Sequence, residues 1–507
     1  MTTTDAPPEQ TGGLSLLRIM PGLIIAMLLA QLDNVVVGTA MPRIVGELGG
    51  LEHLSWVVTA YTLAATVSTP LYGKLGDLYG RKKLFLFAIV VFLAGSMLSG
   101  AAQSMLQLIV FRAIQGLGAG GLIVSVMAII GELVPPRERG KLQGYFGSVM
   151  AVSMIGGPLL GGFVTDHFSW RWAFYINLPL GAVALILVVT TLHLPTKVNP
   201  HRIDYLGAAL LTAGITAVVL VTTWGGTQYG WGSATIIGLG AFGVLALAAF
   251  CWVESRATEP MVPLRLFRDR NFSAIAGVTF VSGFAMFGAI TFLPLFMQIV
   301  QGASATNSGV LLIPLMIGAL VGSQGGGQMI TRTGKYRPQL AVGSLLMVGG
   351  LLLLTMLDAD TTKVMTVSYM VVLGLGIGLL MPVTIIVAQN SVEMKDMGVA
   401  SSTSMFFRTI GGSFGVALAG AIFTSRLGIA GGGSARLDPA TVQSLPAPAR
   451  DAVATAVSHA TQGVFMWSAI VAALSILLTL LVRTVPLRGM QGPAADAKPA
   501  EDLVSAG

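Results

Sequence analysis

Long apolar segments separated by short polar connectors run through nearly the whole chain. Most hold roughly 18 to 26 residues, which is enough for a helix to cross a bilayer core about 30 Å thick. The pattern therefore predicts an all-α integral membrane protein. Its fourteen predicted membrane helices span residues 16–41, 54–73, 84–102, 106–131, 142–165, 172–194, 204–223, 233–253, 272–299, 307–330, 339–357, 364–388, 399–425 and 463–482.

Two connectors share one design. Residues 73–83 follow the second predicted helix and residues 327–337 follow the tenth, with glycines and basic residues at matching offsets. Asp77 of the first connector is replaced by Thr331 in the second. The match implies a duplication in which helices 1 to 6 correspond to helices 9 to 14, with helices 7 and 8 inserted. Parallel repeats are typical of transporters that bind substrate between their halves near the membrane midplane.

The predicted organisation follows from this duplication. The outer loop is rich in Ala, Pro and Gly, so we expect it to be partly disordered or to form a small lid. The predicted parts are an N-terminal tail (1–15), a six-helix bundle (16–195), two inserted helices (196–260), a second six-helix bundle (261–485) with the outer loop (426–462), and a C-terminal tail (486–507).

Composition supports a membrane protein. Hydrophobic residues make up 54% of the 507 residues and charged residues only 10%, with a mean hydropathy of +0.80. Such a chain has too little polar surface to cover a soluble globule of its size. The single cysteine, Cys251, excludes an intrachain disulfide. No small-residue cleavage site closes the first apolar segment, so we expect a retained helix and no signal peptide.

Basic residues report the orientation of the helices. The net charge of +7 is spread over the connectors and forms no single patch, which argues against binding to nucleic acid. With a cytoplasmic N-terminus, 21 of the 29 Lys and Arg residues fall in inner segments and six in outer segments. This bias predicts that both termini are cytoplasmic.

A carboxylate lies within the first apolar segment. A charge in the hydrocarbon region costs at least about 2.5 kcal/mol, so Asp33 marks an ion or substrate pathway, unless it makes a structural polar contact between helices. At 1.5 Å per residue, Asp33 lies roughly 12 Å below the outer end of its helix, and Arg112 in the fourth helix lies roughly 9 Å below the same surface. Arg112 would stabilise the charged form of Asp33 until the two separate. We predict a proton switch; a static ion pair is the alternative.

The first of the repeated connectors is a candidate conformational latch. Gly73 and Gly80 allow a tight reversal between helices. Asp77 can pair with Arg81 or face the N-terminus of the helix that begins near Gly398, in the opposite half. Such a contact would hold the outward-facing state closed on the inside. The alternative is a basic loop that serves only to orient the helices.

The fifth predicted helix is a candidate hinge. It holds Gly157, Pro158, Gly161 and Gly162 in one short stretch. Small residues let helices pack closely, and proline removes a backbone hydrogen bond and kinks the helix. A packed hinge that denies protons a leak would suit an antiporter, and ordinary helix packing is the alternative.

Two further polar residues in membrane segments are candidate substrate or gating contacts. Arg408 lies in the thirteenth helix, roughly 15 Å from the inner surface. It has no obvious acidic partner, so it could contact an anionic substrate group or a helix end. Gln115 lies one helical turn from Arg112. Aromatic residues could line an adaptable apolar pocket: Phe284, Phe287, Phe292, Phe296, Phe406 and Phe407.

Several motifs resemble those of the major facilitator superfamily. Residues 73–82 (GKLGDLYGRK) resemble its signature loop, and residues 112–119 (RAIQGLGA) resemble its proton-linked arginine motif. Gly147 followed by residues 156–162 (GGPLLGG) is similar to its antiporter motif. Four further segments resemble motifs of the superfamily's fourteen-helix drug:proton antiporter branch: residues 32–33 (LD), 40–42 (AMP), 170–179 (WRWAFYINLP) and 204–207 (DYLG).

The resemblance covers about residues 15–485. It implies the major facilitator fold and proton-coupled antiport of hydrophobic, often cationic drugs out across the plasma membrane, a bacterial inner membrane. It also implies proton coupling at Asp33 with Arg112 beside it. The expected partners are a hydrophobic small molecule, protons and the bilayer; we expect a monomer without cofactor, metal or nucleic acid. The single deep carboxylate favours monovalent cations or neutral compounds.

The chain departs from the family pattern at three points. Asn34 stands where the first-helix motif usually has Thr, and Gly38 stands where it has Asn. The middles of helices 9 to 14 hold no acidic residue, although some relatives carry them there. Asp33 therefore has no evident substitute as proton carrier.

Other function classes have weaker support. Residues 116–121 fit a dinucleotide-binding pattern and residues 411–415 fit a hydrolase pattern, but both lie inside predicted membrane helices and read as packing glycines. No phosphate loop or zinc pattern is present, which argues against an ATP-driven pump and a metalloenzyme. The rivals are a proton-coupled importer or facilitator of a small metabolite and a membrane-embedded enzyme or sensor.

Overall fold

The computed structural model describes residues 12–49, 54–134, 136–192, 194, 204–225, 228–257, 260, 262–302, 311–393, 396–426, 442 and 446–486. The tail up to residue 11, most of the segment between residues 427 and 445, and the tail from residue 487 lie outside the described residues. What the sequence predicts for those segments stays a prediction.

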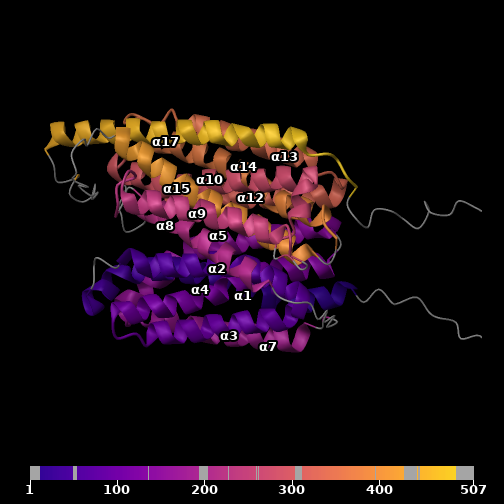
Figure 1. The fold of residues 1–507 in the computed structure, drawn as a ribbon. Helices are drawn as coiled ribbons and strands as arrows, with labels where there is room; N and C mark the ends of the chain where they lie inside the picture. The colour runs from indigo at the N-terminus through magenta and orange to yellow at the C-terminus, as the bar shows by residue number, and fades with distance from the viewer. Residues whose placement is uncertain are drawn as a thin grey trace, which may run out of the picture.

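Long α-helices run side by side through the molecule (Figure 1). Each of the predicted membrane segments overlaps at least one helix. The helices are α1 (Gly12–Leu48), α2 (Leu54–Tyr79), α3 (Arg81–Gly100), α4 (Met105–Leu133), α5 (Pro136–His167), α6 (Trp172–Tyr175), α7 (Asn177–Thr191), α8 (Tyr205–Trp224), α9 (Ala234–Glu254), η2 (Leu264–Arg268), α10 (Arg270–Ile299), α12 (Ile313–Thr333), α13 (Arg337–Leu354), α14 (Lys363–Asn390), α15 (Met397–Arg426) and α17 (Ala447–Leu481).

Eleven helices in the described part of the chain are long and apolar enough to cross a membrane. The predicted membrane helices outside this set are α2, α5 and α12. These three pack against other long helices across the middle of the molecule, α2 on α15 and α5 on α12. A helix covered by protein carries more glycine and polar residues than one covered by lipid, which explains their lower hydropathy.

The long helices form two halves with the same internal packing. We call α1 to α7 the N-half and α10 to α17 the C-half. In the N-half, α1 packs on α5 and α7, α4 packs on α2 and α3, and α3 packs on α7. In the C-half, α10 packs on α15 and α17, α14 packs on α12 and α13, and α13 packs on α17. The two sets correspond helix for helix, and the halves form two layers (Figure 1).

Each of the repeated connectors turns at a glycine with a positive φ. Gly80 lies between α2 and α3 with φ of 96°, and Gly334 lies between α12 and α13 with φ of 66°. Residues with a side chain rarely adopt these positive φ values, so glycine is needed at both positions. The matching glycine offsets therefore mark two positions with positive φ, although ψ differs, at 128° for Gly80 and 2° for Gly334.

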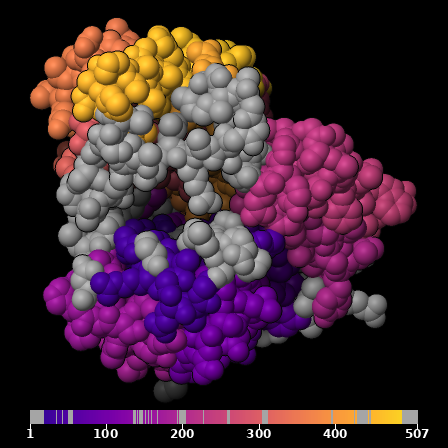
Figure 2. Space-filling model, turned by 90° about the vertical axis from the view of Figure 1, so that its left-hand side faces the viewer, coloured from indigo at the N-terminus to yellow at the C-terminus, as the bar shows by residue number. Residues whose placement is uncertain are grey.

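The inserted helices lie outside both halves. α8 and α9 pack on each other, and α8 also contacts α2 of the N-half and α15 of the C-half. The pair thus covers one side of the boundary between the halves, as the magenta and pink region of Figure 2 shows. The two helices therefore lie beside the two halves and belong to neither set of packed helices.

The two ends of the molecule differ. α1 begins and α17 ends at the same end, on the right in Figure 1, which we call the N/C end. Figure 2 views the opposite end, where the surface is hollowed between the N-half and the C-half. We call this the distal end.

The predicted outer loop 426–462 is too long. Helix α17 already begins at Ala447, so residues 447–462 are helical and project beyond the other helices at the distal end (Figure 1). Alanine is the strongest helix former, and this stretch is rich in it while carrying charges that lower its hydropathy. Hydropathy alone therefore placed the start of the helix too late.

Glycine permits the close approach of α3 and α4. A Cβ atom at Gly118 would collide with the backbone of Phe92, and one at Gly95 would collide with the backbone of Gln115. Small residues at such crossings let two membrane helices gain contact along their length. The fourth helix is thereby held at a fixed distance from the third.

We expect Gly118→Val to destabilise the protein by about 1–3 kcal/mol or more, because the added side chain overpacks this crossing. The matched control is Gly238→Val in α9, since a Cβ atom at Gly238 meets no atom within 4 Å. Thermal unfolding of the purified proteins in detergent measures both effects. Equal melting temperatures for the two variants would contradict the packing argument.

Candidate functional site

Asp33 and Arg112 form a buried ion pair. Asp33 lies in α1 and Arg112 lies in α4, and an Arg112 Nη1 atom donates to Asp33 Oδ2 at 2.5 Å. Both side chains have 0% exposure. The prediction that the two residues lie at similar depth is confirmed.

Two amides complete the surroundings of the carboxylate. Gln115 Nε2 donates to Asp33 Oδ1 at 2.8 Å, and Asn177 Nδ2 of α7 donates to the same oxygen at 2.7 Å. Arg112 Nη1 also donates to Gln115 Oε1 at 2.9 Å, and Asn177 Nδ2 reaches Ser96 Oγ of α3 at 3.0 Å. Helices α3, α4 and α7 thus all contribute to the hydrogen-bond network around Asp33 of α1.

A tyrosine covers the ion pair. The Tyr61 ring of α2 lies 4.0 Å from the Arg112 guanidinium, a cation–π distance, and its hydroxyl donates to the Ala30 carbonyl at 3.1 Å. Arg112 Nε and Nη2 have no hydrogen-bond partner. Tyr61 also lines the main cavity, whereas Asp33 and Arg112 do not. The ring therefore separates the ion pair from the cavity.

The main cavity lies between the two halves and has a volume of about 720 Å³. Residues of α1, α2 and α4 line one side and residues of α10 and α15 line the other, with α8 closing the side between them. A volume of this size falls within the range of sites for drug-sized ligands. None of its described lining residues is charged.

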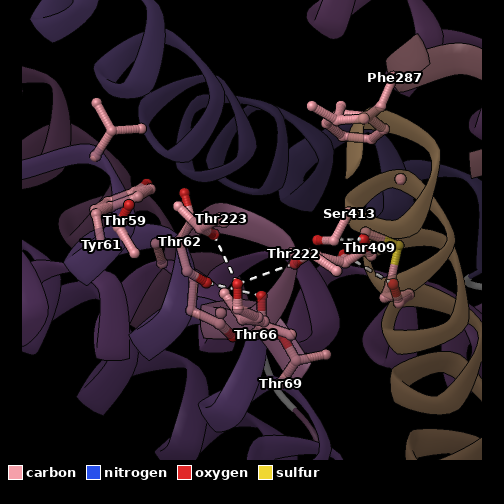
Figure 3. A pocket seen from close by; sticks show the side chains of 18 of the residues that line it. Thr59, Tyr61, Thr62, Thr66, Thr69, Thr222, Thr223, Phe287, Thr409 and Ser413 are labelled. Atoms are coloured by element: carbon pink, nitrogen blue, oxygen red, sulfur yellow. Dashed lines mark hydrogen bonds between the residues drawn. The ribbon is translucent and has the colours of Figure 1, made fainter. Parts of the chain in front are cut away.

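Threonine hydroxyls supply much of the polar lining. Thr66 donates to the Thr62 carbonyl at 2.7 Å, and Thr223 of α8 donates to the Val219 carbonyl at 2.7 Å. Because these hydroxyls bond within their own helices, they leave a mildly polar wall. Figure 3 shows the threonines of α2 and α8 on one side of the cavity and Thr409, Ser413 and Phe287 on the other. The threonine lining consists of Thr59, Thr62, Thr66, Thr69, Thr222, Thr223, Thr291 and Thr409.

A smaller recess of about 180 Å³ continues the main cavity toward the N/C end. The two share the lining residues Gln31, Ile123, Phe287, Met405 and Thr409. The recess is lined by six methionines, which adapt well to different shapes. Among its described lining residues, Arg408 is the one that carries a charge.

Hydrogen bonds join the halves at the N/C end. The Val399 backbone N–H, at the start of α15, donates to Asp77 Oδ2 at 3.2 Å. Arg81 Nη2 donates to Asp77 Oδ1 at 2.9 Å, and Arg81 Nη1 donates to the Ala128 carbonyl of α4. A Cβ atom at Gly73 would meet Ser402 of α15. The predicted partner of Asp77, the helix that begins near Gly398, is confirmed.

A second bridge at this end was not predicted from sequence. Arg139 of α5 donates to Gln389 Oε1 of α14 at 3.1 Å, and Gln389 Nε2 donates to the Met127 carbonyl at 3.3 Å. Arg139 Nε also donates to the Val134 carbonyl at 2.7 Å. The halves are therefore hydrogen-bonded to each other at the N/C end, while the cavity lies in the part of the helices toward the distal end.

Sequence comparison decides the family. The model of the Major Facilitator Superfamily matches residues 23–416. The chain is 42% identical over 410 residues to multidrug transporter protein MdtP of Bacillus subtilis, covering 81% of this chain and 76% of that protein. It is 37% identical to multidrug resistance protein 3 of the same organism, with 86% of each chain covered. The chain belongs to the major facilitator superfamily.

Solved structures agree on the fold. The human organic anion transporter MFSD10 (TETRAN) has a TM-score of 0.60 at 13% identity, with 92% of this chain and 100% of that chain covered. The proton:xylose symporter XylE has a TM-score of 0.59 at 14% identity, with 92% and 96% covered. The predicted major facilitator fold is confirmed, and this superfamily member is a membrane transporter and not an enzyme.

The glycines of α5 face α1 in this superfamily member. A Cβ atom at Gly157 would collide with Val35, and one at Gly161 would collide with Thr39. Pro158 follows Gly157 in the same helix, while a Cβ atom at Gly162 would meet open space. The equivalent pair of the C-half packs alike, since Cβ atoms at Gly411 and Gly415 of α15 would collide with α10. Gly157 and Gly161 therefore form the packed face, and Gly162 is not part of it.

The structure revises two further expectations. Gln115 does not line the cavity but belongs to the Asp33 ion-pair network, because it lies on the face of α4 that crosses α3. Of the six candidate aromatics, Phe287 and Phe292 line the cavity, whereas Phe284 and Phe296 are buried elsewhere. The glycines of residues 116–121, which fit a dinucleotide-binding pattern, pack against α2 and α3, as expected for packing glycines. Among the described residues, no cluster of His, Cys, Asp or Glu could hold a metal ion.

The threonine face of α2 can be recognised from the spacing of threonines in the sequence. Thr59, Thr62, Thr66 and Thr69 are separated by three, four and three residues, which places them on one side of a helix. A polar stripe on a membrane helix indicates a face turned away from lipid. Its direction within the molecule, toward a cavity or toward a neighbour, depends on packing that the spacing does not contain.

We expect strong coupling between Asp33 and Arg112 in a double-mutant cycle. Removing one member of a buried pair costs roughly 3–5 kcal/mol, because the other charge is left uncompensated. Asp33→Asn with Arg112→Gln should therefore destabilise less than the sum of the two single variants in thermal unfolding. The control cycle uses Glu47 and Arg171, a partly exposed pair at 2.9 Å, where coupling should stay below about 1 kcal/mol. Additive effects at Asp33 and Arg112 would show that the contact is energetically unimportant.

Proposed function

We propose that the protein is a proton-coupled antiporter that exports hydrophobic, drug-like compounds across the plasma membrane by alternating access. The observation that carries the proposal is a buried carboxylate, paired with an arginine, directly behind the wall of a largely apolar cavity between two pseudo-equivalent halves. The similarity to transporters named for multidrug transport and resistance supports the direction and the substrate class.

The proposed topology has fourteen transmembrane helices and both termini in the cytoplasm. Eleven described helices qualify by length and composition, and α2, α5 and α12 cross beside them where protein covers their polar faces. The excess of Lys and Arg in the connectors at the N/C end supports its cytoplasmic placement. The proposed state is an outward-open monomer in a bacterial inner membrane, which the cavity toward the distal end supports.

Asp33 is the proposed proton carrier. Its carboxylate accepts hydrogen bonds from Arg112, Gln115 and Asn177, so donors on two other helices hold it in place. Protonation would remove the negative charge that holds the Arg112 guanidinium and would loosen the contact between α1 and α4. Tyr61 lies between this pair and the cavity, so movement of its ring would link substrate binding to proton release.

Asp77 and Arg81 are the proposed latch of the outward-open state. Asp77 accepts a hydrogen bond from the N-terminus of α15, where the helix dipole favours a negative charge. Gly73 and Gly80 allow the close helix approach and the tight turn that bring Asp77 there. Breaking this contact and the bridge between Arg139 and Gln389 would open the cytoplasmic side.

The packed face of Gly157 and Gly161 is the proposed antiporter hinge. Their contact with Val35 and Thr39 lies on the same helix as Asp33 and less than two turns from it. A rocking motion of α5 against α1 would therefore be felt at the proton site. Pro158 supplies a point where the backbone hydrogen bonding of α5 is interrupted.

The cavity lining changes the expected substrate charge. Sequence reasoning favours cationic or neutral compounds, but no described residue that lines the main cavity carries a carboxylate. Asp33 is engaged by Arg112 and is screened by Tyr61. We therefore propose neutral hydrophobic compounds as substrates ahead of cationic ones.

Asp33→Asn should abolish proton movement driven by substrate in everted membrane vesicles, because the amide cannot take up or release a proton. A resistance profile of a pump-deficient host across dyes, antiseptics and antibiotics first identifies a transported compound. The matched control is Asp360→Asn, which neutralises an exposed carboxylate between α13 and α14. Undiminished coupling in the inserted, folded Asp33→Asn protein would overturn the proton assignment, and accumulation of substrate inside intact cells would indicate an importer.

Ser413→Cys should react with a membrane-impermeant methanethiosulfonate from outside intact cells, because Ser413 lines the cavity toward the distal end. The neighbour Phe414 is 44% exposed and does not line the cavity, so Phe414→Cys should face lipid and stay unmodified. Both variants are built after Cys251→Ser, since Cys251 is exposed. Modification of Ser413→Cys only in everted vesicles would contradict the proposed orientation.

A further inference from the structure

Arg408 is buried near the middle of the membrane-crossing region. It lies eleven residues after the start of α15, or roughly 16 Å along the helix axis at 1.5 Å per residue. Its relative exposure is 6%. A guanidinium stays charged under physiological conditions, so a full positive charge is kept at this depth.

This charge lacks a carboxylate partner. Arg408 Nη2 reaches Thr384 Oγ1 of α14 at 3.3 Å, and Nε has no hydrogen-bond partner. No ion pair joins Arg408 to an acidic side chain in the part of the chain that the structure describes. Arg112, which is likewise buried within a membrane helix, is paired at 2.5 Å. Buried charges are normally paired, so the unpaired state of Arg408 calls for a ligand.

A second unsatisfied group lines the same recess. Ser323 of α12 has 1% exposure, and its Oγ has no hydrogen-bond partner. Arg408 and Ser323 both line the recess of about 180 Å³ at the closed end of the main cavity. Buried polar atoms without partners are rare in folded proteins. Two of them in one small cavity, a cation and a hydroxyl, form a suitable site for an anionic oxygen.

The surroundings specify the rest of the ligand. The remaining recess walls are mostly apolar, with Met27, Met127, Met150, Met286 and Met381 among them, so the recess does not suit a strongly hydrated ion such as phosphate. It opens into the main cavity through shared lining residues, among them Phe287 and Met405. A ligand that fits has one anionic group at its end and an apolar body behind it.

We propose that this recess binds the carboxylate of an amphiphilic substrate, with the guanidinium of Arg408 and the hydroxyl of Ser323 as donors and the apolar body in the main cavity. The proposal rests on the proposed export function and extends it from neutral compounds to hydrophobic carboxylic acids and zwitterions. Arg408 selects substrate and carries no proton, so coupling stays with Asp33. The site is thus separate from the proton site in both position and role.

Naphthoic acid and its neutral analogue naphthamide test the proposal because they share ring and size. Binding of each tritiated compound to the purified full-length protein in lipid nanodiscs is measured by scintillation proximity. Arg408→Gln should weaken naphthoate binding about tenfold to a hundredfold, the range for loss of a charge-assisted contact, and should change naphthamide binding less than about threefold. Arg408→Lys keeps the charge and should retain part of the naphthoate affinity.

Arg426→Gln is the matched control. It removes the same charge from the exposed end of the same helix, eighteen residues away, and should leave naphthoate binding unchanged. Thermal unfolding checks that each variant is folded, and Ser323→Ala supplies a second variant with a smaller expected loss. Equal loss of acid and amide in Arg408→Gln, or no loss of either, would overturn the proposal.

The source of the anion is tested in the same assay. Binding of naphthoate is compared in sodium chloride and in sodium gluconate. An affinity for naphthoate that is the same in both salts supports an organic carboxylate as the ligand. Loss of naphthoate binding in sodium chloride, because chloride saturates the site, would overturn the proposal. Export of naphthamide coupled to protons reports on the proposed function independently, so failure at Arg408 is distinguishable from failure of antiport.

Discussion

The buried ion pair of Asp33 and Arg112 is the constraint on which the organisation of the N-half depends. Neither charge is tolerated at 0% exposure without the other, so α1 and α4 must meet at one depth. The other carboxylate oxygen accepts hydrogen bonds from Gln115 and Asn177. Asn177 also donates to Ser96, which connects α3 to the network. Gly95 makes room for the backbone of Gln115 at that crossing. Four helices are thus positioned by the requirements of one carboxylate.

This arrangement also explains why the cavity is nearly free of charge. Tyr61 places its ring on Arg112 and forms part of the cavity wall, so the ion pair lies just behind the surface that a substrate would touch. A hydrophobic substrate therefore need not desolvate a carboxylate in order to bind. The threonines of α2 and α8 keep the wall wettable while bonding within their own helices. Such a wall favours compounds by size and apolar surface, with little demand for specific hydrogen bonds.

Much of the fold was predictable because helix length, connector charge and depth along a helix are one-dimensional quantities. The ranges of the helices, the repeated turn at Gly80 and Gly334, and the meeting of Asp33 with Arg112 all depend on them. The rotation of a helix about its axis depends on its neighbours instead. The threonine face, the place of Gln115 and the bridge between Arg139 and Gln389 were missed for this reason. The early start of α17 was missed because its first turns are helical without being apolar.

Arg112 and Arg408 mark a division of labour between the halves. Arg112 belongs to the N-half, is paired and does not line the cavity. Arg408 belongs to the C-half, lines the recess and has no acidic partner among the described residues. A charge that responds to protons must be shielded from substrates. Otherwise each substrate would alter the coupling between proton binding and transport in its own way. A charge that selects substrates must be left unpaired, because an internal partner would compete with the ligand. One duplicated scaffold can meet both requirements only by placing the two charges on opposite sides of the cavity wall.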